Sequence, residues 1–261
     1  MKKTDIKEYS SSSEEVGRSK LIKLLMESPL PQNQLLSNLG LFLDSKNLSR
    51  FLFMDHLFRK IIDVQGVIIE FGTRWGQNMA LFQALRGIYE PFNRHRKLIA
   101  FDTFQGFPKI HDKDGYSEMM HNGQLSLTEN YENYLNEILK AQESLNPLEH
   151  LKKFELRKGD ATIECKNYLD EHPHTVVAFA YFDFDLYEPT KKCLELIKPR
   201  LTKGSVLGFD EVNDPDSPGE TLAVMEALGL NNIRLKRFQY ASRVSYCISC
   251  QFLSSTIIVQ H

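Results

Sequence analysis

The pattern of hydrophobic and polar residues changes its period near residue 62. Between Leu21 and Ile62, apolar residues recur at three- and four-residue steps, which predicts a helical preface. Residues 1–20 are rich in Ser, Lys and Glu, and we expect them to form a loosely held arm. The preface is too short to form a hydrophobic core of its own, so it is not a separate domain. We therefore predict an arm and preface over residues 1–62 and one domain over residues 63–261.

In the second part of the chain, short apolar runs alternate with segments of helical periodicity. The predicted strands are Gly66–Phe71, Lys97–Asp102, Phe154–Asp160, Val176–Asp183 and Gly204–Asp210. The predicted helices are Gln77–Tyr89, Thr162–Leu169, Pro189–Leu201 and Gly219–Leu228. Such alternation is typical of βαβ units, so we predict an α/β fold with a parallel sheet that helices cover on both faces.

The end of the chain departs from this alternation. Residues 232–238 and 243–248 form two predicted strands with only a short turn between them, and a short turn makes the two strands antiparallel. Five parallel strands followed by a hairpin give the mostly parallel, seven-stranded sheet of the class I methyltransferase fold, a Rossmann-like sandwich. A nicotinamide-binding domain would normally continue with another βα crossover.

An insertion over residues 109–150 separates the second and third strands by more than the usual connection. It contains a predicted helix over residues 129–145. Because ligands bind at the carboxyl edge of a parallel sheet, we interpret the insertion as a lid or substrate-recognition cap. The alternative is a segment that packs on the core or on another subunit.

Composition excludes several classes of partner. Hydrophobic residues make up 42% of the chain, charged residues make up 25%, and the formal net charge is −2. This balance favours neither nucleic acid nor an anionic membrane. No apolar run approaches the ~18 residues of a membrane span, and the N-terminus is too polar for a secretory signal. We expect a soluble, cytoplasmic protein in which Cys247 and Cys250 are ordinary thiols rather than a zinc site.

A glycine turn follows the first strand, with the spacing Glu70-x-Gly72-x-x-x-Gly76. Glycines at such a turn let the backbone approach a ligand. The spacing differs from the G-x-G-x-x-G of a pyrophosphate binder. An acid at its start suits S-adenosylmethionine, which carries a sulfonium and an amino group and no phosphate.

Two further acids end the next strands. Asp102 stands where a carboxylate can accept hydrogen bonds from both ribose hydroxyls, as in nicotinamide cofactor sites. Asp160 ends the third strand, where it can meet the adenine amino group. Together these acids indicate an adenosine ligand without choosing between cofactors.

Four carboxylates converge at the ends of the fourth and fifth strands: Asp183, Asp185, Asp210 and Glu211. Like charges at this density are unfavourable unless a cation is bound, and hard oxygen ligands suit Mg²⁺ or a similar divalent ion. Such an ion would lower the pKa of a substrate hydroxyl and align its oxygen. The alternative is a set of ordinary acids at strand ends.

The run Asp183-Phe-Asp185-Leu-Tyr187-Glu188-Pro-Thr190 resembles the D-G-D-L-Y-E-S-T signature of the macrocin O-methyltransferase-like family, which methylates deoxysugar hydroxyls. Residues 102–108, 69–72 and 209–211 resemble three further motifs of that family, in the same order. The departures are Phe184 in place of a glycine, Glu211 in place of an aspartate and Gln77 in place of a second glycine.

The resemblance implies an S-adenosylmethionine-dependent O-methyltransferase, a sugar-containing acceptor and a homo-oligomer. It implies that Asp183, Asp210 and Glu211 hold a metal ion and that Asp185 is the general base. The expected cofactor-binding residues are Glu70, Gly72, Thr73, Gly76, Asp102, Thr103, Asp160 and Asp183. Three alternatives remain: a metal-dependent methyltransferase of catechol-like aromatics, an NAD-dependent oxidoreductase and a non-catalytic binding module.

Overall fold

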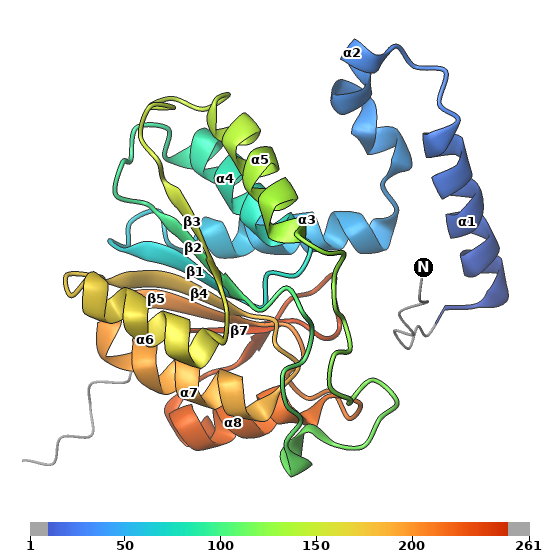
Figure 1. Cartoon of the computed structure of the whole chain (residues 1–261). Coiled ribbons are helices and arrows are strands. Elements are labelled where there is room, and N and C mark those ends of the chain that lie inside the picture. Colours follow the sequence, from blue (N-terminus) through green and yellow to red (C-terminus); the bar gives the residue numbers. More distant parts are fainter. Residues whose placement is uncertain (1–9, 250–261) are drawn as a thin grey trace, which may run out of the picture.

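A seven-stranded sheet organises the chain in the computed structural model, which describes residues 10–249 (Figure 1). The strands are β1 (Val67–Phe71), β2 (Leu98–Asp102), β3 (Phe154–Lys158), β4 (Val177–Phe182), β5 (Leu201–Phe209), β6 (Lys236–Arg237) and β7 (Ser245–Ile248). Their order across the sheet is β3-β2-β1-β4-β5-β7-β6. Strands β1 to β5 are parallel, whereas β7 runs antiparallel to β5 and β6 antiparallel to β7. The predicted fold is confirmed.

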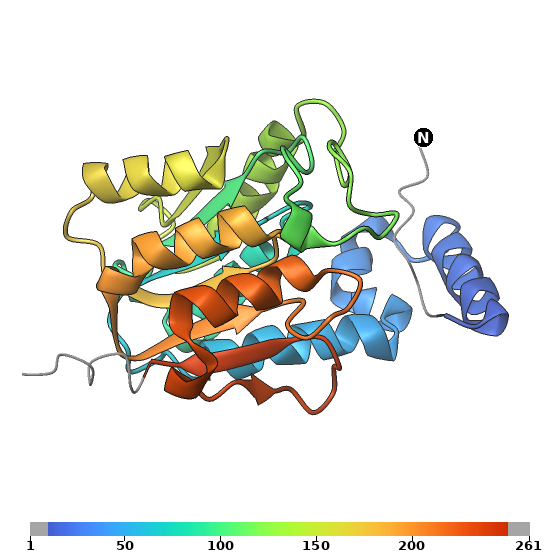
Figure 2. The same cartoon turned by 90° about the horizontal axis from the view of Figure 1, so that it is seen from below.

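Helices cover both faces of this sheet. The helices are α1 (Ser12–Met26), α2 (Gln32–Leu35), α3 (Ser45–Phe58), α4 (Gln77–Tyr89), α5 (Tyr131–Glu143), α6 (Ala161–Glu171), α7 (Tyr187–Ile197) and α8 (Pro218–Leu228). Short 3₁₀ segments are η1 (Leu36–Phe42), η2 (Asp112–Asp114), η3 (Lys198–Arg200) and η4 (Leu230–Asn232). Figures 1 and 2 show α3, α4 and α5 on one face and α6, α7 and α8 on the other.

The core has two halves because successive strand residues point to opposite faces. Ile68 packs in a cluster with Phe53 of α3 and Phe82 of α4. Its neighbour Ile69 belongs to the opposite cluster, which contains side chains of α6, α7 and α8. All residues of β1 and β4 are buried, and this burial on both faces explains their apolar sequences, which only Glu70 of β1 interrupts.

The cysteines of the described residues belong to this core. Cys165 of α6, Cys193 of α7 and Cys247 of β7 are buried free thiols. Burial raises the pKa of Cys247 to about 12, which keeps its thiol protonated and unreactive at neutral pH. Cys250, the other half of the C-x-x-C sequence, lies outside the described residues.

Parallel register aligns the carboxyl ends of the central strands. Phe71 at the end of β1 pairs with Phe101 of β2 and with Phe182 of β4, and Phe182 pairs with Phe209 of β5. The residues that follow these phenylalanines therefore emerge side by side at one edge of the sheet.

The N-terminal segment is more ordered than the predicted loose arm, because α1 begins at Ser12. The Ser11 hydroxyl accepts a hydrogen bond from the Glu14 backbone, and the Glu14 carboxylate accepts one from the Ser11 backbone at 2.6 Å. This reciprocal pair is a capping box. Its Ser-x-x-Glu signature lies within the polar composition that we interpreted as a loose arm. None of the α1 residues is buried, and the helix stands beside the domain in Figure 1.

The insertion over residues 109–150 divides into two parts. Its first part approaches the carboxyl edge of the sheet, where Met119 and Leu125 line a cavity. Its second part, α5, packs on the core through Leu135 and Leu139, which are both buried. The proposed lid therefore corresponds to the first part only, and α5 is a structural helix.

A buried ion cluster joins α5 to the rest of the domain. Glu143 contacts the guanidinium of Arg86 from α4 and lies 2.5 Å from the ammonium of Lys153. Arg86 also donates a hydrogen bond to the Lys153 carbonyl at 2.9 Å. All three residues are less than 5% exposed. Removing the shared carboxylate would leave two buried cations without an anionic partner, with hydrogen bonds to backbone carbonyls only.

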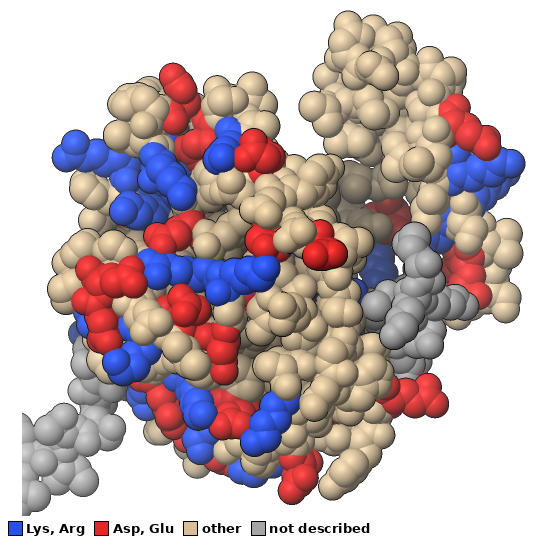
Figure 3. All heavy atoms as spheres, viewed as in Figure 1, with Lys and Arg blue, Asp and Glu red and all other residues tan. Residues whose placement is uncertain are grey.

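The molecular surface carries charges of both signs. On the face in Figure 3, Lys and Arg residues are interspersed with Asp and Glu over the sheet domain, and the region of α2 and η1 has few charges. None of the described helices combines the length and the apolarity that crossing a membrane requires.

We expect Glu143→Leu to lower the free energy of unfolding by about 3–5 kcal/mol, because it leaves the Arg86 and Lys153 cations buried and unpaired. The matched control is Glu137→Leu on the same helix, whose exposed carboxylate pairs with Lys140. Exposed pairs contribute little. Urea unfolding of both variants measures the difference, and equal unfolding midpoints would contradict the prediction.

Candidate active site

A cavity of about 350 Å³ opens at the carboxyl edge of the sheet, between the loops that follow the parallel strands. Nine predicted site residues line it: Gly72, Thr73, Asp102, Thr103, Asp160, Asp183, Asp185, Asp210 and Glu211. Glu70 and Gly76 do not line it. Residues of the insertion form part of its wall, and Arg50 of α3 and Arg243, which precedes β7, complete it.

The loop after β1 has the conformation that its glycines predict. Gly72 has φ +84° and Gly76 has φ +80°, a region that L side chains rarely adopt. A side chain on Gly72 would collide with the backbone oxygen of Asp183, and one on Gly76 would collide with Leu135. Gly72 therefore lets the loop lie directly against the end of β4, and Gly76 is the N-cap of α4.

Glu70 is a fully buried acid at the end of β1. Neither of its carboxylate oxygens makes a hydrogen bond of normal geometry within residues 10–249, although the side chains of Asn78 and Thr73 lie close enough to lower its pKa. Burial raises its pKa to about 8, with a further contribution from Asp183. The nearby Thr73 hydroxyl is likewise buried and without a partner among the described residues. Unpartnered buried acceptors fit the cationic amino group of S-adenosylmethionine, which would satisfy them.

Asp102 is positioned by the two loops beside it. One oxygen accepts the Arg74 backbone N–H at 2.6 Å, and the other accepts the Phe104 backbone N–H at 2.5 Å. Each oxygen keeps a lone pair for a further donor, which fits the pair of ribose hydroxyls. Burial raises the pKa of Asp102, and these backbone hydrogen bonds oppose the increase.

The other two predicted cofactor residues hold loops in place. Asp160 caps α6 by accepting hydrogen bonds from the Thr162 backbone and hydroxyl at 2.8 and 2.7 Å. Both bonds use the same oxygen, Oδ1. Thr103 donates its hydroxyl to the Gly106 carbonyl at 2.9 Å. Thr103 follows β2, Asp160 follows β3, and both residues line the cavity.

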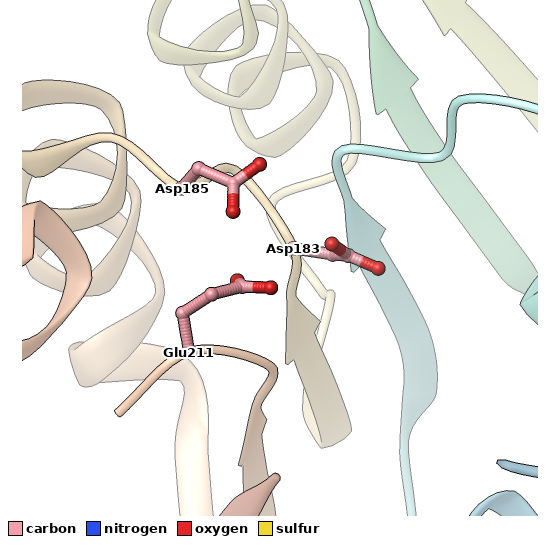
Figure 4. Close-up of side chains that lie close together, drawn as sticks. All are labelled: Asp183, Asp185 and Glu211. Carbon is pink, nitrogen blue, oxygen red and sulfur yellow. The ribbon is translucent and has the colours of Figure 1, made fainter. Parts of the chain in front are cut away.

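Three carboxylates meet at the ends of β4 and β5. Asp183, Asp185 and Glu211 each offer one oxygen such that the three oxygens lie within 4.8 Å of one another. Figure 4 shows Asp185 and Glu211 on the two neighbouring turns and Asp183 extending away from Asp185. Burial raises the pKa of Asp185 to about 6, and Asp183 adds to the increase. Asp185 also has φ +60°, a strained conformation for a residue other than glycine.

Glu211 has a second buried acid beside it. Its backbone N–H donates to the Glu220 carboxylate at 3.0 Å, and both side chains are buried. Burial, followed by the neighbouring carboxylates, raises the pKa of each acid well above its usual value. Arg243 offsets part of this charge, since it lies 2.5 Å from Glu211 and 3.0 Å from Asp214. The Oε2 atom of Glu211 is buried and has no hydrogen-bond partner among the described residues.

Asp210 lies outside the group of three carboxylates, although it is adjacent to Glu211. Its carboxylate contacts the guanidinium of Arg50 and accepts a hydrogen bond from the hydroxyl of Tyr181. Arg50 also pairs with Asp183 at 2.8 Å. The predicted metal ligands are Asp183, Asp210 and Glu211. In the structure, Asp185 takes the place of Asp210 in this group of carboxylates.

Arg50 is one of the site residues that the sequence interpretation missed; Arg74, Arg243 and Glu220 are others. Arg50 belongs to α3, within the segment that we assigned to a helical preface. A signal for it exists in the sequence, because Arg50 lies one turn before Phe53 and Met54 on the stripe that also carries Leu57. A charged residue on the buried stripe of a helix needs a counter-charge, and the acids of the site provide it.

The first part of the insertion is attached to the active-site loop. The Asp114 carboxylate accepts the Tyr187 backbone N–H at 2.6 Å and the His111 backbone N–H at 2.7 Å. Lys113 donates to the Tyr187 hydroxyl at 3.1 Å and pairs with Glu226 of α8. Tyr187 begins α7 two residues after Asp185, so the insertion holds the turn that carries the candidate base.

Comparison with solved structures identifies the family. A crystal structure of CalS11, described as a calicheamicin methyltransferase, has a TM-score of 0.90 and 40% sequence identity and covers 95% of this chain and 99% of its own. An apo structure of CalS11, described as a TDP-rhamnose 3'-O-methyltransferase in calicheamicin biosynthesis, has a TM-score of 0.83 and 39% sequence identity. It covers 93% of this chain and 96% of its own. This chain belongs to the macrocin O-methyltransferase-like family of sugar O-methyltransferases.

Membership of this O-methyltransferase family confirms the predicted enzyme class, an S-adenosylmethionine-dependent O-methyltransferase. The structure of the O-methyltransferase NovP shares the fold, with a TM-score of 0.59 and 20% identity over 77% of this chain and 80% of NovP. No model of a known protein family matches the sequence, and comparison with curated proteins gave no match. The enzyme class and the sheet order both oppose the oxidoreductase alternative.

Proposed function

We propose that this enzyme transfers the methyl group of S-adenosylmethionine to a hydroxyl of a deoxysugar that is linked to a nucleoside diphosphate. The observation that carries the proposal is the 40% identity, over 95% of the chain, to CalS11, because CalS11 acts on TDP-rhamnose. The cavity supports it, since acids suited to the cofactor and the carboxylate cluster line the same 350 Å³ space.

The chain's own residues would orient the cofactor. Asp102 would accept the ribose hydroxyls, and Asp160 would meet the adenine amino group. The predicted contact between Glu70 and the amino group of the methionine end needs the buried Glu70 carboxylate, which does not line the cavity, to become accessible. Gly72 lets that end approach the backbone of β4. The sulfonium would then lie beside Asp183, which favours a cation electrostatically.

A divalent cation fits the carboxylate cluster. Asp183, Asp185 and Glu211 would hold it, and the buried Oε2 atom of Glu211 would gain the partner that it lacks among the described residues. When bound, Mg²⁺ or a similar ion lowers the pKa of the acceptor hydroxyl and orients its oxygen. The prediction that Asp210 is a ligand needs its carboxylate to leave Arg50 and Tyr181.

The transfer itself needs a base. The acceptor oxygen attacks the methyl carbon, the carbon–sulfur bond breaks, and S-adenosylhomocysteine leaves as a neutral thioether. The hydroxyl proton would pass to a carboxylate oxygen of Asp185, which lines the cavity.

We expect the enzyme to methylate a nucleotide-linked deoxysugar in the presence of Mg²⁺ and to lose turnover in EDTA, with recovery when Mg²⁺ is added back. The measurement is formation of S-adenosylhomocysteine with nucleotide-linked sugars, neutral glycosides and catechols as acceptors. Full turnover in a metal-free preparation would contradict the metal role, and preferential turnover of catechols would contradict the acceptor class.

We expect Asp185→Asn to lower kcat about 100- to 10,000-fold, because the amide cannot accept the hydroxyl proton. Binding of S-adenosylhomocysteine, measured by calorimetry, should stay close to that of the wild type. The matched control is Asp112→Asn, an exposed acid of the insertion that does not line the cavity. Full kcat in the Asp185 variant would exclude it as the base.

We further propose that the enzyme is a homo-oligomer and that residues 12–42, which belong to the arm and the helical preface, form the contact. None of these residues is buried, and several large apolar side chains are more than half exposed. Examples are Met26 and Leu36, each 79% exposed, and Leu41, 64% exposed. Apolar exposure at this density marks an interaction surface.

The cytoplasmic location of the enzyme stays a prediction.

The double variant Leu36→Glu and Leu41→Glu should dissociate the oligomer, because two charges would have to be desolvated in the contact. Light scattering after size-exclusion chromatography measures the mass. The matched control is Ile163→Glu on α6, where the side chain is also more than half exposed. A wild-type monomer, or a double variant with the wild-type mass, would contradict the proposed contact.

A further inference from the structure

Arg74 is the cavity arginine whose charge has no acidic partner. Arg50 pairs with Asp183 and Asp210, and Arg243 pairs with Glu211 and Asp214. For Arg74, no ion pair with a carboxylate forms in the part of the chain that the structure describes. Its Nε atom is buried and lacks a hydrogen-bond partner there. A buried guanidinium donor without an acceptor indicates a ligand.

The backbone of Arg74 is held in a strained conformation. Its φ is +48°, in the left-handed region that glycine or asparagine adopts at lower cost. The loop is fixed by the hydrogen bond from the Arg74 N–H to Asp102. The strain places an arginine side chain against the cavity, and strained residues of this kind concentrate at ligand sites.

The surroundings of Arg74 indicate the charge of its ligand. The cavity is lined by the carboxylates of Asp102, Asp160, Asp183, Asp185, Asp210 and Glu211, against three arginines. An anionic acceptor would be repelled by these acids unless a positive group receives it. Arg50 and Arg243 are already paired, so Arg74 is the cation with free capacity among the described lining residues.

We propose that Arg74 binds a phosphate of the nucleoside diphosphate in the acceptor and so sets the specificity for nucleotide-linked sugars. The inference rests on the proposed function. A planar guanidinium donates two parallel hydrogen bonds to a phosphate. Arg74 lines the same cavity as Asp185 and Glu211. The amino acid end of the cofactor is the competing source of an oxyanion.

The test compares Arg74→Met and Arg74→Lys with Arg94→Met, which changes an exposed arginine outside the cavity. Arg74→Met should raise KM for the nucleotide-linked sugar, and Kd for thymidine diphosphate, about 10- to 100-fold, the loss expected for charge-assisted hydrogen bonds. Arg74→Lys, which keeps the charge, should recover part of the affinity. KM for a neutral glycoside and Kd for S-adenosylhomocysteine should not change. Thermal unfolding checks that the variants fold.

Two outcomes would overturn the assignment. In the first, Arg74→Met weakens S-adenosylhomocysteine but neither thymidine diphosphate nor 5′-methylthioadenosine, which lacks the amino acid end of the cofactor. Arg74 would then bind the cofactor carboxylate. In the second, no affinity changes. A wild-type enzyme that methylates no nucleotide-linked sugar would instead contradict the proposed function, and the thymidine diphosphate titrations would still decide the role of Arg74.

Discussion

The packing of like charges at the end of the sheet is the constraint on which the active site depends. Parallel pairing brings the ends of β1, β2, β4 and β5 to one edge, and an acid stands at or just beyond the end of each strand. Burial, followed by the neighbouring carboxylates, raises the pKa of Glu70 and of Glu211, and both acids have buried oxygens without a hydrogen-bond partner among the described residues. Two arginines offset part of the negative charge of these acids. The negative charge that remains favours the binding of cationic ligands. A site of this charge fits the sulfonium of S-adenosylmethionine and the divalent ion that we propose.

The two arginines, Arg50 and Arg243, come from the segments that precede and follow the parallel strands. Arg50 precedes the first strand, on a helix that also supplies Phe53 and Leu57 to the core. Arg243 lies between β6 and β7, in the antiparallel extension of the sheet. The helix before the first strand and the hairpin after the last helix thus have a shared electrostatic role, because each supplies a counter-charge to the same acids.

Most of the fold and much of the site could be predicted from local patterns. The apolar runs gave the strands because burial on both faces leaves few polar positions, and acids after these runs marked the edge of the sheet. The patterns did not distinguish Asp185 from Asp210 as a neighbour of Asp183, because that choice depends on where Arg50 and Tyr181 lie. Long-range contacts of this kind leave no spacing in the sequence. The helix α1 was missed for a different reason. Its capping signal lies within a segment whose polar composition we interpreted as a loose arm.

The contact between Asp114 and the Tyr187 backbone has a thermodynamic consequence. It joins the 3₁₀ turn of the insertion to the start of α7, two residues after the left-handed backbone of Asp185. The equilibrium of the docked turn and the equilibrium of that backbone conformation are therefore linked, and the coupling free energy acts equally in both directions. A ligand that stabilises the docked turn also preorganises the carboxylate, and a ligand that orders the carboxylate helps to close the turn. The insertion is in this sense coupled to the turn that carries Asp185.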